Sequence, residues 1–330
     1  MNKNYFYLFL PLLLFCTFFN ADAQDSPVVL RDTTGNNLKN SKLTKDSSLI
    51  KQSMKTATVA SADSTPPVVS HLQLSLTWQS NAVNNGRKDS SVIPLITPEI
   101  SYIFKNGFEI DLSVGYNTHE ASPQVNQYTL AGSYSYTAGN YSGSATVSGF
   151  IYSKHSASTT AEQKGSVASA NNYDFGFIQP SLNLTWTFGT TPSDFQAAFA
   201  LQHEFNIGNL SITPTTTMNA ATQNAYNAYY QNRRFSIPRN DGKPPYPGDV
   251  TITGTVLNAN KFQVLDYEFS APIGFTAGKW VFNYTPIYAM PVHPADIEIT
   301  TKTNHHSLVG TYKQTLPNVF YMSVGVTYDF

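Results

Sequence analysis

Apolar and polar residues alternate along most of the chain after position 67, most clearly at its end. From 320 to 330 every second position is apolar: Phe320, Met322, Val324, Val326, Tyr328 and Phe330. The positions between them carry Tyr321, Ser323, Gly325, Thr327 and Asp329. A period of two is typical of a β-strand with one apolar and one polar face. The run is therefore predicted to be a strand whose apolar face needs an apolar environment.

The same alternation predicts nine further strands: 71–80, 96–104, 108–116, 128–136, 144–152, 179–188, 195–201, 265–275 and 280–288. Two other stretches look extended, 210–212 and 250–256, which brings the expected total to about twelve within a range of ten to fourteen. The segment AYNAYYQNRRF between them is open to interpretation as a short helix, a strand or a loop. Five prolines cannot donate a ladder hydrogen bond, so bulges or strand ends are expected to accommodate them. They are Pro98, Pro180, Pro214, Pro272 and Pro286.

The length of these runs and their connections indicate the architecture. At ~3.3 Å per residue and a tilt near 40°, a run of about ten residues rises roughly 25 Å, the height of an outer-membrane apolar band. Short turns are predicted at 105–107, where Asn-Gly is a hairpin signal, and at 138–140, 191–194 and 276–278. Long polar connections are predicted at 119–126, 153–172 and 292–316. This alternation favours an all-β, antiparallel transmembrane β-barrel, with short periplasmic turns and long extracellular loops, over a β-sandwich.

Composition supports this fold class and excludes others. Among 330 residues, charged residues are 12%, about half the usual share of a soluble domain, and aromatic residues are 13%. The formal net charge of −1 gives no reason to expect nucleic acid as a partner. A mean hydropathy of −0.24 excludes a bundle of membrane-spanning helices.

The N-terminus carries a targeting signal. Lys3 precedes an apolar run over 5–19, and Ala21-Asp22-Ala23 follows it, which predicts a secretory signal peptide over 1–23. The run is short for a membrane anchor and no positively charged flank follows it. Cys16, the only cysteine, lies inside the run after a bulky phenylalanine, so we expect no lipidation and no disulfide or thiolate site in the mature chain.

Residues 24–67 are polar, lack periodicity and end in Pro66-Pro67. They are predicted to form a flexible periplasmic segment, either a linker or a plug that folds into the pore. The barrel would then occupy 68–330, with its first strand near His71 paired to its last, because no unpaired strand edge can face hydrocarbon.

These features together resemble Gram-negative outer-membrane β-barrel proteins. In detail the chain is similar to uncharacterised members of Bacteroidetes type, on late runs such as LDYEFSAP and YTPIYAMP. The resemblance covers about 68–330 and implies location in the outer membrane, in contact with its lipid. It also implies that the last strand, with Tyr328 and Phe330, is the signal read by the barrel-assembly machinery.

Candidate chemistry lies on the polar phase of the strands, which should face the lumen. Six carboxylates share this phase: Glu99, Glu109, Asp111, Glu204, Asp266 and Glu268. They predict an acidic lumen that favours cations or hydroxyl-rich solutes. Alternatively, Arg233, Arg234 or Arg239 folds inward as a plug and neutralises them.

Other residue patterns give weaker indications. Tyrosines near strand ends, such as Tyr102 and Tyr116, are interpreted as interfacial girdles rather than a sugar-stacking track. His203 and Glu204 lie near a strand end with Ser211 on the next strand, but no nucleophile motif surrounds them. Adjacent His305 and His306 fit a solvated loop better than a metal site. We therefore expect no enzyme activity, cofactor or metal.

The sequence favours a small channel or transporter for small polar or cationic solutes. The alternatives are a closed structural or adhesion barrel whose outer loops bind a partner and, with less support, an outer-membrane lipid hydrolase.

Overall fold

The computed structural model describes residues 69–88, 94–118, 124–153, 156, 160–190, 192–232, 251–303 and 306–330. Nearly all regular structure in these ranges is antiparallel β, with one short helix, α3 (Asn224–Asn232). No helix of the described ranges is long and apolar enough to cross a membrane. The predicted signal peptide, the segment 24–67 and Arg233, Arg234, Arg239 and His305 lie outside these ranges.

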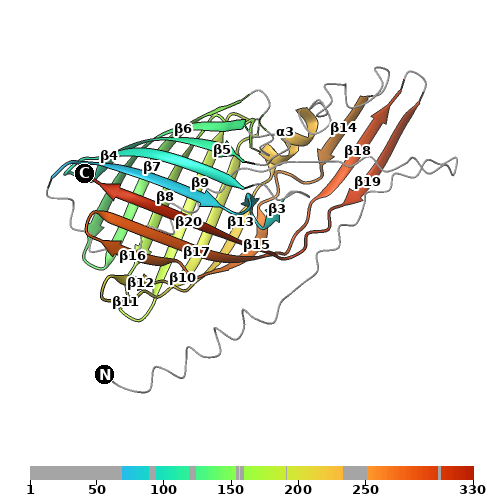
Figure 1. Cartoon of the computed structure of the whole chain (residues 1–330). Helices are drawn as coiled ribbons and strands as arrows, with labels where there is room; N and C mark the ends of the chain where they lie inside the picture. Colours follow the sequence, from blue (N-terminus) through green and yellow to red (C-terminus); the bar gives the residue numbers. More distant parts are fainter. Residues whose placement is uncertain are drawn as a thin grey trace. The chain divides into compact units, whose positions relative to one another are not determined.

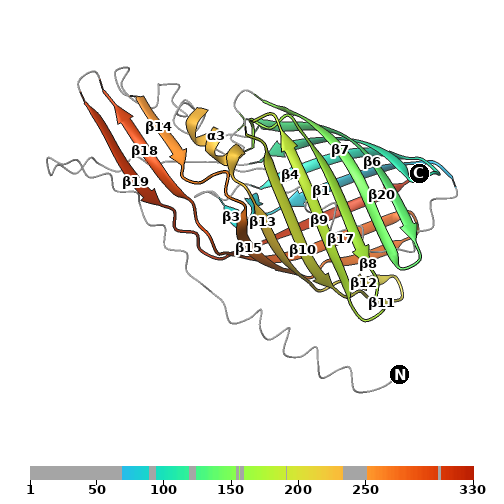
Figure 2. The same cartoon turned by 180° about the vertical axis from the view of Figure 1, so that it is seen from behind.

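Twelve antiparallel strands close into a barrel, as predicted (Figures 1 and 2). They are β1 (His71–Gln79), β4 (Leu95–Ile103), β5 (Phe108–Asn117), β6 (Gln124–Ala138), β7 (Tyr141–Tyr152), β8 (Gly165–Tyr173), β9 (Gln179–Phe188), β10 (Asp194–Gln202), β13 (Thr215–Ala221), β15 (Gln263–Ser270), β17 (Trp280–Pro291) and β20 (Val319–Asp329). Three short strands continue β10, β13 and β15 after breaks: β11 (Phe205–Ile207), β12 (Leu210–Ile212) and β16 (Ile273–Ala277).

The first and last strands form the seam that closes the barrel. β20 pairs with β17 on one side and with β1 on the other, where Gln73 lies opposite Asp329 and Gln79 opposite Ser323. The backbone N–H of Phe330 donates to the carbonyl of Leu72 over 3.0 Å. Each edge of the sheet is thus satisfied by the other, which is the condition for placing strands in hydrocarbon.

Apolar side chains cover the outside of the barrel and polar side chains line the inside. On β20, Phe320 is 61% exposed and Val324 45%, whereas Ser323 between them is 7% exposed. β5 alternates in the same way, with Leu112 exposed and Asp111 and Ser113 buried. This inverts the usual order of a soluble domain and confirms the two-residue period seen in the sequence.

Prolines mark irregularities in three neighbouring strands. Pro214 separates β12 from β13, Pro272 separates β15 from β16, and Pro286 lies where β17 changes partner from β16 to β15. Their carbonyls still accept hydrogen bonds from the N–H groups of His203, Thr213 and Ala271 on the adjacent strands. Because proline has no N–H, the ladder is interrupted there while the wall of the barrel continues.

The connections fall into a short-turn end and a long-loop end. The tight turns at 105–107, 139–140 and 278–279 lie at the short-turn end, together with 174–178 and 208–209. A short connection does join β9 to β10, but it lies at the long-loop end, which corrects the assignment of the predicted turn 191–194 to the other side. Short turns of outer-membrane barrels face the periplasm, and the long-loop end would accordingly face outward.

One of the twelve predicted strands was wrong and one barrel strand was missed, so the two errors cancel in the count. β8 lies inside the stretch 153–172 that was expected to be a loop, because its sequence GSVASANNY is too small and polar to show an apolar phase. The stretch 250–256, expected in the barrel, forms β14 (Thr251–Val256) outside it. β14 pairs with β18 (Asp296–Lys302), which pairs with β19 (Ser307–Lys313), so a separate three-stranded sheet joins two long loops.

The first long loop carries a two-stranded hairpin, β2 (Val83–Asn84) and β3 (Arg87–Lys88), which we call the mouth hairpin. Asn85 and Gly86 form its turn, with φ of 47° and 70°. Both values are positive, as a tight hairpin turn requires. The mouth hairpin lies at the long-loop end of the barrel beside β13 and β15 (Figures 1 and 2).

Candidate functional site

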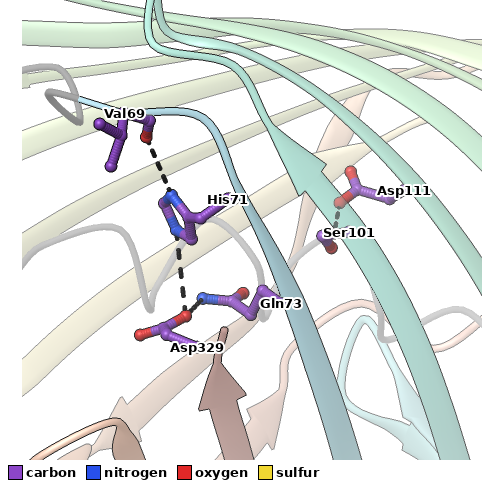
Figure 3. A network of polar contacts seen from close by, with 6 residues as sticks. All are labelled: Val69, His71, Gln73, Ser101, Asp111 and Asp329. Atoms are coloured by element: carbon purple, nitrogen blue, oxygen red, sulfur yellow. Dashed lines mark hydrogen bonds and ion pairs between the residues drawn. The ribbon is translucent and has the colours of Figure 1, made fainter.

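Three of the six predicted lumen carboxylates lie together on the inner wall of β4 and β5. Asp111 accepts a hydrogen bond from the Ser101 hydroxyl over 2.5 Å, directly across the two strands (Figure 3). Glu99 accepts from Ser75 on β1 over 3.5 Å. These serines are small donors on the same inward phase, so each carboxylate is held against the wall by a cross-strand partner.

Glu109 completes this group and accepts a hydrogen bond from Ser133 on β6 over 3.3 Å. We call Glu99, Glu109 and Asp111 the wall carboxylates. They lie on two adjacent strands in the half of the barrel toward the short-turn end. The sequence brings them together because a tight turn at 105–107 connects the two strands that carry them.

A fourth carboxylate, Asp329, lies at the seam and was not among the predicted site residues. Its Oδ1 accepts a hydrogen bond from Gln73 Nε2 over 2.8 Å and lies 4.0 Å from His71 Nε2 (Figure 3). The Nδ1 atom of His71 lies 3.4 Å from the Val69 carbonyl. The place of Asp329 in the alternation of the last strand indicated an inward side chain. The sequence alone did not show that β1 would supply its hydrogen-bond partners.

Asp266 and Glu268 form a second acidic group, near the long-loop end of β15. Asp266 is 0% exposed, and Glu268 accepts a hydrogen bond from the Tyr321 hydroxyl over 3.1 Å. Tyr321 itself belongs to an apolar cluster with Val83, Ile287, Ala289 and Val319. Asp266 is therefore fully enclosed by protein, whereas Glu99 and Glu109 on the wall remain partly exposed.

The mouth hairpin encloses this pair. Val83 packs in the apolar cluster around Tyr321, and Gln196 on β10 donates to Asn85 Oδ1 over 3.3 Å. A Cβ at Gly86 would lie 2.7 Å from the Cβ of Asp266, so the backbone of the hairpin rests directly against that strand. The hairpin thus contacts the wall from β10 to β20 at the mouth of the barrel.

Arg87 brings the nearest described positive charge to the pair. Its Nη2 donates to the carbonyl of His293 over 3.3 Å, and its Cζ lies 4.9 Å from the centroid of the Tyr226 ring. Burial lowers the pKa of the Arg87 guanidinium, and its electrostatic interactions with Tyr226, Tyr230 and Asp266 oppose that shift. The cation suggested for this role from sequence was Arg233, Arg234 or Arg239, which lie outside the described residues.

Helix α3 covers the mouth beside the hairpin. Asp194, the first residue of β10, caps the helix: its carboxylate accepts from the N–H groups of Asn224 and Ala225 over 2.6 and 2.7 Å. On the helix, Tyr229 is 2% exposed and Tyr226 accepts a hydrogen bond from Gln314 of the last long loop. Residues of three long loops therefore meet at Tyr226 and Arg87.

The remaining predicted residues are dispersed. Glu204 lies between β10 and β11, in the half of the barrel toward the short turns. His203 next to it packs its ring edge-on against Phe205, with centroids 4.5 Å apart, and shares the outward phase of Leu201. Ser211 lies on β12 near the same turn. These residues are not at the outer rim, where a lipid hydrolase site was considered.

The predicted tyrosine girdles are partly visible on the outside. Tyr102, Tyr116, Tyr134 and Tyr284 are exposed. Tyr136 is half-buried, and its hydroxyl donates to Asn171 over 3.2 Å. Within the described ranges, no three histidine, cysteine, aspartate or glutamate residues come together as a metal-binding group.

Comparison with known proteins gives only distant similarity. No family model matches the sequence, and no curated protein matches it. Among solved structures, "KdgM porin" matches with 11% identity and a TM-score of 0.41, over 79% of this chain and 99% of that chain. LpxR from Salmonella typhimurium matches with 6% identity and a TM-score of 0.38, over 78% and 100%. Such low identities and TM-scores carry no information about what this chain transports or binds.

Proposed function

We propose that the protein is an outer-membrane channel for small polar or cationic solutes. The observation that supports this most directly is the position of the wall carboxylates on adjacent strands inside a closed barrel with an apolar outer face. A ring or wall of carboxylates raises the local concentration of cations and disfavours anions. The apolar outer face, together with the predicted signal peptide, supports location in the outer membrane.

The folded long-loop end suggests that conduction is restricted there. The mouth hairpin and α3 are held in the mouth by the Asn85–Gln196 hydrogen bond and by the contact of Arg87 with Tyr226. These contacts are made by residues of the long loops, so they are candidates for local opening without loss of the barrel. The proposed channel would therefore open and close at its outer mouth.

Ion selectivity tests the proposal. In a planar bilayer with a salt gradient, we expect the refolded chain to conduct and to show a reversal potential of the sign for cation preference. The double variant E109Q/D111N removes two wall carboxylates while keeping their shape. It should lower the ratio of cation to anion permeability roughly twofold or more, because the local negative potential is reduced.

The matched control is E298Q, which neutralises a carboxylate of β18 outside the barrel wall. It should leave the permeability ratio unchanged. If E109Q/D111N conducts with the same reversal potential as the unchanged protein, the wall carboxylates do not set selectivity. If no conductance is found for the unchanged protein, the channel function itself is wrong.

A second candidate function is a closed barrel whose outer loops bind a partner. The observation in its favour is that the loops are structured: β14, β18 and β19 form a sheet with its own apolar cluster of Val256, Ala259, Ala295 and Ile297. Permanent absence of conductance in correctly folded protein would favour this candidate. Recognition of Tyr328 and Phe330 by the barrel-assembly machinery is part of either proposal.

A further inference from the structure

Three oxygen-bearing side chains converge at one point of the inner wall near the outer mouth. Asp266 and Glu268 are two residues apart on the inward phase of β15, and Asn219 on β13 lies directly opposite Asp266 in the register. The register shifts after this pair, where Ala220 lies opposite Val264 and Leu265 is the extra residue of a β-bulge. Bulges commonly redirect side chains beside functional sites.

Asp266 and Asn219 are buried with side-chain oxygens that lack a hydrogen-bond donor, whereas Glu268 accepts from Tyr321. Asp266 is 0% exposed and Asn219 is 3% exposed. Among the described residues, neither carboxylate oxygen of Asp266 nor the Oδ1 atom of Asn219 has a hydrogen-bond donor in good geometry. The side chain of Asn219 lies within interaction distance of both carboxyl groups. Enclosing two carboxyl groups in this way is costly unless positive charge compensates them.

Arg87 does not supply that compensation by direct contact. It attracts Asp266 electrostatically, but its donated hydrogen bond goes to the carbonyl of His293. In the described part of the chain, no lysine or arginine nitrogen lies within ion-pair distance of Asp266 or Glu268. When both carboxyl groups are ionised, one arginine at a distance leaves one of the two negative charges uncompensated.

We propose that Asp266, Glu268 and Asn219 form a binding site for a divalent cation of the calcium or magnesium type, beneath the mouth hairpin. All three side chains offer oxygen ligands, which these cations prefer, and water would complete the coordination. The hydrogen bond from the Tyr321 hydroxyl fixes the Glu268 carboxylate in place, as partners of metal-ligating carboxylates commonly do. The site is separate from the wall carboxylates and does not depend on whether the barrel conducts.

Calorimetric titration of the refolded full chain in detergent micelles with calcium chloride, and separately with magnesium chloride, tests the site. We expect saturable binding of one ion by the unchanged protein and a rise in its thermal unfolding midpoint. In D266N the affinity should fall at least tenfold, because a charged ligand becomes neutral at constant shape. E298Q, which neutralises a carboxylate of β18 outside the barrel wall, should bind as tightly as the unchanged protein.

A second variant tests the same site by removing a positive charge instead of a negative one. R87Q removes the nearby positive charge that competes with the ion for Asp266, so the affinity should increase several-fold. If D266N is poorly folded, as judged by its gel mobility with and without heating, E268Q takes its place in the comparison. Equal binding by the unchanged protein and the carboxylate variants, absence of binding to the unchanged protein, or weaker binding by R87Q would overturn the proposal.

Discussion

Gly86 shows how one residue connects the mouth hairpin to the barrel wall. Its φ of 70° suits the hairpin turn, and the absence of a side chain lets the backbone approach Asp266. Gly139, in the tight turn between β6 and β7, has a similar φ of 60° but no atom within 4 Å of a Cβ added there. Alanine substitutions at these two glycines therefore distinguish the cost of backbone strain alone from the cost of strain together with a steric clash.

We expect G139A to lower the free energy of unfolding by about 1 kcal/mol, the usual cost of a left-handed alanine. G86A should lower it by about 3 kcal/mol, because the new methyl group also displaces the hairpin from β15. Urea unfolding of the refolded proteins in detergent measures both values. Equal losses in the two variants would show that the hairpin does not rest on the wall.

Single residues also show what the sequence could and could not predict. The inward position of Glu109 and Asp111 followed from the two-residue period alone. The partner of Asp329 could not be predicted, because it depends on the seam register between residues 256 positions apart. Arg87 was overlooked although Asn85-Gly86 is a standard hairpin signal, since a short hairpin between two long strands has no apolar period of its own.

At the scale of elements, apolar periodicity predicted the strands that carry large apolar residues on the lipid side and failed elsewhere. It missed β8, whose outward positions include Val167 and, at its end, Tyr173, but otherwise small or polar residues. It placed β14 in the barrel because a strand in a small extramembrane sheet has the same period. The prolines gave better information: Pro214 and Pro272 lie at strand breaks, as expected, although Pro98 and Pro286 lie inside β4 and β17.

Helix α3 depends on a cap from outside the helix. Asp194 accepts hydrogen bonds from the backbone of Asn224 and Ala225 and from the Thr222 hydroxyl. Replacing it by alanine should remove about 0.5–2 kcal/mol of local stability, the usual value of an N-cap. Hydrogen exchange at the amides of α3 should then be roughly 2- to 30-fold faster in D194A, because 1.4 kcal/mol corresponds to a factor of ten.

The matched control for this prediction is D296A, which removes the carboxylate that begins β18. Exchange in α3 should be the same in D296A as in the unchanged protein. If exchange in α3 is equally slow in D194A, packing of Tyr229 rather than the cap holds the helix in the mouth.

At the scale of the whole molecule, closure of the barrel and its apolar outer surface depend on each other. Apolar residues can cover the outside only if the membrane takes the place of water, and the membrane tolerates the strands only if β1 and β20 satisfy each other. The sequence predicted this state because the period, the strand length and the loop asymmetry agree. The arrangement of the long loops at the mouth was beyond prediction, because it rests on contacts among Arg87, Tyr226 and Gln314 from three different loops.

Spin labels placed one at a time along β20 test the central claim most directly. With Cys16, the only cysteine, replaced by serine, each position from 320 to 328 receives one label in protein reconstituted in lipid bilayers. Collision with oxygen, which concentrates in the acyl chains, should be high at Phe320, Met322, Val324, Val326 and Tyr328 and low at the positions between them. Uniform collision rates along the strand, or high rates at the odd positions, would contradict a sealed barrel whose even positions face lipid.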